Sequence, residues 1–86
     1  HRLLRDGQVL PIKPKAFELL AFLLRHPGQA FTRDQLLEKV WGYDYGDSNN
    51  LAVYVRYLRR KTEAHGESRL IHTVRGVGYV LSPQAR

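Results

Sequence analysis

The segment NNLAVYVRYLRRK, from Asn49 to Lys61, decides the fold, because its two halves favour different secondary structures. Its middle, VYVRY, is rich in the β-branched and aromatic residues that are common in strands. Its end, LRRK, favours a helix and carries three adjacent cations. The local pattern alone therefore leaves both a strand and a helix open.

The length of the segment and the residues at its two ends favour the helix. The chain continues through RRKTEAHG with no strand signal, and Gly66 is suited to end a helix. At the other end, either Asp47 or Ser48 can cap the first turn. With about 100° between successive residues, one face of this helix forms an apolar stripe of Leu51, Val55, Leu58 and Thr62.

The opposite face of this helix is predicted to be exposed and cationic, because a domain this small has no second core to cover it. Acids are scarce before Glu63, so most of the cations lack an i,i+4 partner. Arginines interleaved with valine and tyrosine favour nucleic-acid binding over a merely solvated face. The residues expected to project outward are Val53, Arg56, Tyr57 and Arg60, with Ala52, Tyr54, Arg59 and Lys61 on the flanks.

A β hairpin and a further helix are predicted at the N-terminal end. The dipeptide DG at residues 6–7 is a strong hairpin signal, so we expect paired strands at Leu3–Arg5 and Gln8–Leu10. In KPKAFELLAFLLRHPG, Pro14 suits a first helical turn, and the apolar residues recur at helical spacing. The dipeptide PG at residues 27–28 is expected to end this helix.

The segment FTRDQLLEKVWG predicts a second helix with a well-marked start. Thr32 is the expected N-cap, and Gln35 completes a capping box. Phe31 and Leu36 occupy the two positions of a hydrophobic staple. Gly42 is suited to end the helix in a left-handed conformation.

The C-terminal segment RLIHTVRGVGYVL predicts a second hairpin. The β-rich stretches Leu70–Val74 and Tyr79–Leu81 flank the turn RGVG, which places Arg75 at its edge. The order hairpin, helix, helix, loop, helix, hairpin predicts an α+β fold, a winged helix-turn-helix. It has three helices, an N-terminal β hairpin and a C-terminal β-hairpin wing, and we expect one domain over residues 1–86.

Composition narrows the classes of function. The chain has 86 residues, a formal net charge of +6 and no cysteine, so a disulfide framework and a thiolate zinc site are excluded. The basic balance suggests a polyanionic partner. The apolar run LLAFLL is far shorter than the roughly 20 residues that span a bilayer, and no signal-peptide pattern is present. No histidine or carboxylate spacing suggests a metal or catalytic site, so we expect neither an enzyme nor a cofactor.

Three motifs resemble the OmpR/PhoB-type effector domain of bacterial two-component response regulators. They are FELLAFLLRHPGQAFTRDQLLEKVWG, LRRK and, above all, IHTVRGVGYVL. The resemblance implies a cytoplasmic transcription regulator in a phosphorelay, whose receiver domain, absent from this chain, is phosphorylated by a sensor kinase. It also implies homodimers on tandem direct repeats of double-stranded DNA, with the third helix in the major groove and the wing in the minor groove.

The resemblance assigns roles position by position. Val53 and Tyr57 match base-facing positions, and Arg75 matches the minor-groove position. Other matches are phosphate, groove-edge or backbone contacts, at Asn49, Asn50, Tyr54, Arg56, Arg59, Trp41, Thr73 and Tyr79. Arg60 completes the expected DNA-binding set because it shares the cationic face. The segment that touches RNA polymerase in some members matches Gly42, Tyr43, Asp44, Tyr45, Gly46, Asp47 and Ser48.

The chain also departs from the family pattern. Lys13 stands where a Thr or Ser cap is common, and Ala52 where Asp is common. Tyr57 stands where Arg is common, and this difference means that the recognised bases cannot be inherited from a relative. Only the last two strands of the family's four-stranded N-terminal sheet are recognisable. From the residues alone, two alternatives stay open: a winged helix that binds an acidic protein, and a nonspecific RNA binder.

Overall fold

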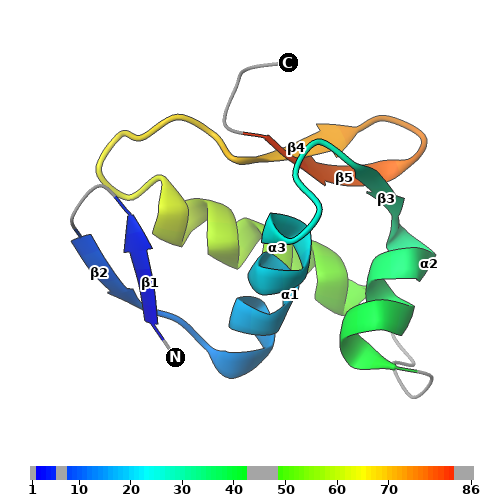
Figure 1. The fold of residues 1–86 in the computed structure, drawn as a ribbon, viewed down its shortest axis with the longest axis horizontal. Coiled ribbons are helices and arrows are strands. Elements are labelled where there is room, and N and C mark those ends of the chain that lie inside the picture. The colour runs from blue at the N-terminus through cyan, green and yellow to red at the C-terminus, as the bar shows by residue number, and fades with distance from the viewer. Residues whose placement is uncertain (1, 6–7, 43–48, 83–86) are drawn as a thin grey trace.

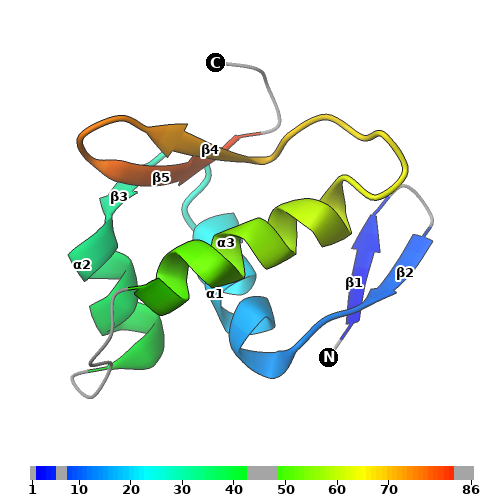
Figure 2. The same cartoon turned by 180° about the vertical axis from the view of Figure 1, so that it is seen from behind.

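The computed structural model describes residues 2–5, 8–42 and 49–82. Figures 1 and 2 show the helices packed together, with a hairpin at one end of the molecule and a small sheet along one side. In chain order the elements are β1 (Arg2–Arg5), β2 (Gln8–Pro11), α1 (Pro14–Leu24), β3 (Ala30–Thr32), α2 (Arg33–Leu36), the π-helical η1 (Leu37–Trp41), α3 (Asn49–Thr62), β4 (Ile71–Val74) and β5 (Gly78–Leu81). This is the predicted winged-helix architecture.

The segment Asn49–Lys61, whose local pattern fits both a strand and a helix, is helical. α3 is 14 residues long, and its predicted apolar stripe is buried, with Leu51, Val55, Leu58 and Thr62 at most 1% exposed. The Thr62 hydroxyl donates to the Leu58 carbonyl oxygen at 2.8 Å, so its polar group is satisfied inside the core. The helix ends before the predicted Gly66, which instead closes the following turn with a φ of 84°.

The start of α1 agrees with the prediction from its proline. Pro14 is the first helical residue, where its missing N–H removes no hydrogen bond. Lys13 precedes it without a side-chain cap. One face of α1 enters the core through the residues Ala16, Leu19, Leu20 and Leu23.

The second helix begins as predicted but is not regular. Thr32 accepts a hydrogen bond from the Gln35 N–H, and the Gln35 side chain accepts one from the Thr32 N–H, which confirms the capping box. After Leu36 the backbone widens into η1, where the Gly42 N–H lies 3.1 Å from the Leu37 carbonyl oxygen. Gly42 ends the segment with a φ of 82°, as expected, but its ψ of −165° is extended and not left-handed helical.

The wing belongs to a three-stranded sheet that the sequence analysis missed. The strand order is β3-β5-β4, with all pairs antiparallel, so β5 is central and β4 has a free edge. Phe31 pairs with Tyr79 across β3 and β5, and its ring lies 4.9 Å from that of Phe22. From the sequence, Phe31 and Thr32 are expected only at the start of a helix, because three residues are too few to show strand alternation.

The core lies between the helices and the inner face of this sheet (Figures 1 and 2). Side chains from α1, η1, α3 and β5 meet in it, among them Leu19, Leu37, Leu58 and Leu81. Within the described residues, no helix has the length and apolar character needed to cross a membrane.

We expect Gly78→Ala to destabilise the protein by about 1–3 kcal/mol, the range for overpacking a tight site. A Cβ at Gly78 would collide with the carbonyl oxygen of Phe31, which is backbone of β3 and cannot rotate away. Urea unfolding of the variant measures the loss. Val77→Ala, at the exposed neighbouring position, is the control and should change stability by less than about 0.5 kcal/mol. Equal unfolding midpoints for Gly78→Ala and the wild type would refute the close approach of the strands.

Candidate nucleic-acid interface

The exposed face of α3 carries cations without acids. Burial of the apolar stripe turns Val53, Arg56 and Arg60 to solvent, with Val53 58% exposed. No acidic residue occurs between Asn49 and Thr62, so no carboxylate within the helix neutralises these arginines. A helix face of this kind presents positive charge beside an apolar contact surface, which suits a polyanion that also has apolar groups.

Tyr57 does not project outward as the sequence predicted. Its ring is half-buried against the core, and its hydroxyl accepts a hydrogen bond from the Lys13 backbone N–H at 3.1 Å. The ammonium groups of Lys13 and Lys61 lie 5.2 and 5.7 Å from the centre of the ring. Lys13 precedes the first turn of α1, so the phenol satisfies a donor that has no partner within that helix. Tyr57 therefore joins α3 to the start of α1.

Tyr54 and Trp41 form the contact between α3 and the end of η1. Both are half-buried, and their ring centres lie 5.3 Å apart in an edge-on arrangement. Lys15 of α1 closes the cluster, since its ammonium lies 5.7 Å from the Trp41 ring and donates to the Val40 carbonyl oxygen at 3.2 Å. Trp41 is thus packed against the core and also partly exposed, as is common for a tryptophan.

Arg59 turns toward the wing and not toward solvent. Its Nε donates to the Ile71 carbonyl oxygen at 3.0 Å, and its Nη2 donates to the Thr73 hydroxyl at 2.9 Å. Its guanidinium carbon lies 5.9 Å from the centre of the Tyr79 ring, which is itself only 9% exposed. The Arg59 side chain therefore bridges α3 and β4 within the protein, whereas the resemblance implies a position at the edge of a DNA groove.

Burial lowers the pKa of the Arg59 guanidinium, and the positive charge of Arg69 lowers it further. Tyr79 and Glu63 act in the opposite direction. The group that lowers this pKa and one that raises it lie side by side, because Glu63 forms an ion pair with Arg69 at 3.2 Å. A hollow beside Arg59 is consequently rich in positive charge, and Glu63 is the one carboxylate among the residues that line it.

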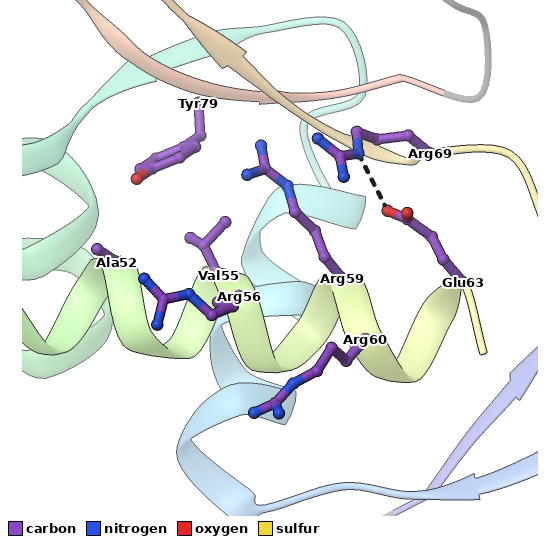
Figure 3. Close-up of a pocket in the computed structure, with 8 residues that line it drawn as sticks. All are labelled: Ala52, Val55, Arg56, Arg59, Arg60, Glu63, Arg69 and Tyr79. Atoms are coloured by element: carbon purple, nitrogen blue, oxygen red, sulfur yellow. Dashed lines mark hydrogen bonds and ion pairs between the residues drawn. The ribbon is translucent and has the colours of Figure 1, made fainter.

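This hollow has a volume of about 580 Å³ and lies along one side of α3 (Figure 3). In Figure 3, Arg59 extends from the helix toward the strands, Arg56 runs along the helix, and Arg60 points to the side away from the strands. The hollow is open to solvent and is lined by Ala52, Val55, Arg56, Arg59, Arg60, Glu63, Arg69 and Tyr79. Arg69 was not among the sequence-predicted site residues, since it lies in the connection to β4 and carries no motif.

The tip of the wing presents Arg75 to solvent. The Val77 N–H donates to the Val74 carbonyl oxygen at 2.9 Å, which closes a β-turn with Arg75 and Gly76 at its centre. Gly76 has a φ of 77°, the conformation that a type II turn requires at its third position. Val77 is also 44% exposed, so the tip combines a cation with a small apolar surface.

Some predicted site residues lie wholly or partly outside what the structure describes. The backbones of Asn49 and Asn50 form the first turn of α3, but their side chains are not described. Of the segment expected to touch RNA polymerase, residues 42–48, only Gly42 lies within the described residues. The capping candidates Asp47 and Ser48 lie outside them. Within the described residues, no group of three metal-binding side chains is found.

Comparison with known proteins places these features in a family. Residues 7–81 match the family described as "Transcriptional regulatory protein, C terminal". The response regulator MprA of Mycolicibacterium vanbaalenii is 64% identical over 78 residues, and the transcriptional regulatory protein YkoG of Bacillus subtilis is 47% identical over 78 residues. Each alignment covers 90% of this chain but 34% of the relative, so the chain spans about a third of these proteins.

Solved structures of similar chains share the fold. The DNA-binding domain of Klebsiella pneumoniae RstA, in complex with the RstA box, is 31% identical with a TM-score of 0.80. The match covers 96% of this chain and 84% of that one. The DNA-binding domain of the response regulator AdeR, in complex with an intercistronic region, is 27% identical with a TM-score of 0.84, covering 95% of this chain and 85% of that one.

We expect Tyr57→Phe to lower the free energy of unfolding by about 0.5–1.5 kcal/mol, the net worth of one hydrogen bond. The change removes the acceptor of the Lys13 N–H and leaves the ring in place. Thermal and urea unfolding measure the effect, with Val53→Ala as the control because that side chain is exposed on the same helix. A Tyr57→Phe variant as stable as the wild type would show that the phenol does not join α3 to α1.

Proposed function

The chain belongs to the family of C-terminal domains of transcriptional regulatory proteins, and we propose that it binds double-stranded DNA sequence-specifically as the output domain of a phosphorelay response regulator. The observation that carries the proposal is the exposed, acid-free face of α3 beside a wing tipped by Arg75. The family is one of transcription regulators and not a class of enzymes.

In the proposed complex, α3 enters the major groove, whose width admits a helix. Val53 makes the apolar contact, for which a thymine methyl is the matching group, and Arg56 and Arg60 bind guanine edges or phosphates. Tyr57 and Arg59 are removed from the direct contacts, because both side chains are engaged within the protein. The proposed contacts with phosphates at the groove edges are made by Trp41, Tyr54, Asn49 and Asn50.

The wing occupies the adjacent minor groove in this proposal. Arg75 is exposed at its tip, and a narrow A·T-rich minor groove attracts an inserted arginine through its enhanced negative potential. Thr73 and Tyr79 contact the DNA backbone nearby. Because the Thr73 hydroxyl accepts from Arg59, its own proton is left to donate to a phosphate oxygen.

The proposed assembly is a homodimer on tandem direct repeats, with half-sites about one helical turn apart. The direct-repeat arrangement rests on the family resemblance. So does a contact of the segment Gly42–Ser48 with RNA polymerase, and so does control by a sensor kinase through a receiver domain in the same protein. Acting on the chromosome places the proposed function in the bacterial cytoplasm.

A salt titration tests the proposed function. If α3 and the wing meet phosphates, the logarithm of affinity should fall linearly with the logarithm of salt concentration, by roughly 0.9 per phosphate contact. Fluorescence anisotropy with a duplex obtained by selection, and with its scrambled control, measures both slope and specificity. We expect a slope of several units on both duplexes and tighter binding to the selected one. A slope near zero on duplex DNA would contradict the proposal and favour the acidic-protein alternative.

We expect Arg75→Ala to weaken specific binding by about 1–3 kcal/mol with little change in folding. The side chain is exposed at a turn, so its loss removes a DNA contact and no core packing. Binding is compared on two duplexes that differ only in the flank beside the major-groove sequence, one A·T-rich and one G·C-rich. The loss should be larger on the A·T-rich flank. Equal losses would make Arg75 a general phosphate contact, and a large fall in melting temperature would make it structural.

A further inference from the structure

The bridge from Arg59 to β4 joins the two elements that would read DNA in the proposed function. One end is the helix proposed to enter the major groove, and the other is a strand of the wing. Figure 3 shows that the side chain spans the space between them, beside the Tyr79 ring. Among the described residues, Arg56 and Arg60 have no side-chain hydrogen bond or ion pair, so Arg59 differs from the other two arginines of α3.

The acceptors of this bridge follow from the register of the wing. The Leu70 carbonyl accepts from the Ser82 N–H, and the Val74 carbonyl accepts from the Val77 N–H, so these carbonyls point toward β5 and its turn. In an antiparallel pair, alternate residues direct their backbone groups to opposite sides. Ile71 therefore turns its carbonyl to the free edge of β4, where it meets the guanidinium at 3.0 Å.

A guanidinium is suited to fix both the distance and the rotation of β4 relative to α3. Its donors are held in one rigid plane, so two bonds to two residues of one strand determine the position of that strand. The Tyr79 ring beside the guanidinium restrains the plane further. Lysine has a single flexible ammonium and cannot reproduce this geometry, although it carries the same charge.

We propose that Arg59 is a positioning residue that sets the distance between α3 and the wing, and thereby the number of base pairs that the domain accepts between its major-groove and minor-groove sequences. The inference rests on the proposed function. A shift of one base pair moves the minor-groove target by about 3.4 Å along the DNA axis. Such a shift exceeds the slack of a hydrogen bond, whose donor–acceptor distances vary by roughly 0.5 Å. A rigid bridge therefore discriminates single base-pair steps.

Selection of binding sites from a duplex library tests the proposal, because selection does not require the operator sequence to be known. The 86-residue chain, its Arg59→Lys variant and its Arg59→Met variant are each used to select from duplexes with a randomised central and flanking sequence. The distance between the central sequence and the A·T-enriched flank is then read from the recovered sites. Arg25→Lys is the control, because this exposed arginine at the end of α1 belongs to no proposed DNA contact.

The wild type and Arg25→Lys should each recover one spacing. Both Arg59 variants should recover sites spread over neighbouring spacings. In direct binding to duplexes of the best and the next spacing, the preference of the wild type should be about tenfold, the scale of one mismatched base pair. The Arg59 variants should lose most of that preference, while their salt slope stays that of the wild type, since no phosphate contact is removed.

Several results would overturn the proposal. One is retention of the single spacing by Arg59→Lys. Another is a salt slope reduced by about 1 in Arg59→Met with equal losses on every spacing, which would make Arg59 a direct phosphate contact. If the Arg59 variants fail to fold, Thr73→Val removes one acceptor of the bridge at an exposed position, together with the proposed phosphate contact of Thr73. Its affinity should fall on every spacing, and its preference between spacings should weaken as in the Arg59 variants. An unchanged preference between spacings would also overturn the proposal.

The same experiment separates this inference from the proposed function. A wild-type chain that binds specifically with one spacing, together with an Arg59→Lys variant that does the same, refutes only the role of Arg59. A wild-type chain that binds all duplexes equally, or none, refutes the proposed function and the inference together.

Discussion

Burial of one stripe of α3 is the constraint on which the rest of the structure depends. Leu51, Val55 and Leu58 are essentially inaccessible to solvent, and each fully buried side chain of this kind contributes roughly 1.5–3 kcal/mol. Rotating the helix by one residue would expose them and drive arginines toward the core, where an unpaired charge costs far more. The direction of Val53, Arg56 and Arg60 is thus set by the packing on the far side of the helix. The exposed face of α3 that is available for binding is therefore determined by the packing of its buried face.

The parts of the fold that were predictable are those with local signals. The helical identity of Asn49–Thr62 followed from its length and its spacing of apolar residues, although its middle favours strands. The capping box at Thr32 and the turn at Gly76 depend on neighbouring residues and were confirmed. β3 was missed because its three residues become a strand only by pairing with β5, far along the chain. The π-helical turns of η1 were not predicted, because the spacing of the apolar residues in this segment does not distinguish a π-helix from an α-helix.

The candidate site was predicted less completely than the fold. Helical periodicity gives the direction in which a side chain leaves the backbone, and it placed Val53, Arg56 and Arg60 correctly on the surface. It does not give the reach of a long side chain or the acceptors it meets. Tyr57 folds back to the start of α1, and Arg59 bends to β4, because each finds a backbone group that lacks a partner within its own element.

The bridge from α3 also changes what the sheet can do with other chains. A strand at the edge of a sheet exposes unpaired backbone groups, which invite a strand from another molecule and so favour aggregation. Natural proteins often place a cation at such an edge to prevent this pairing. In this protein the cation is Arg59 of α3, which donates a hydrogen bond to the Ile71 carbonyl oxygen at the edge of β4. The wing can therefore stand out from the body of the protein and remain closed to strand addition on that side.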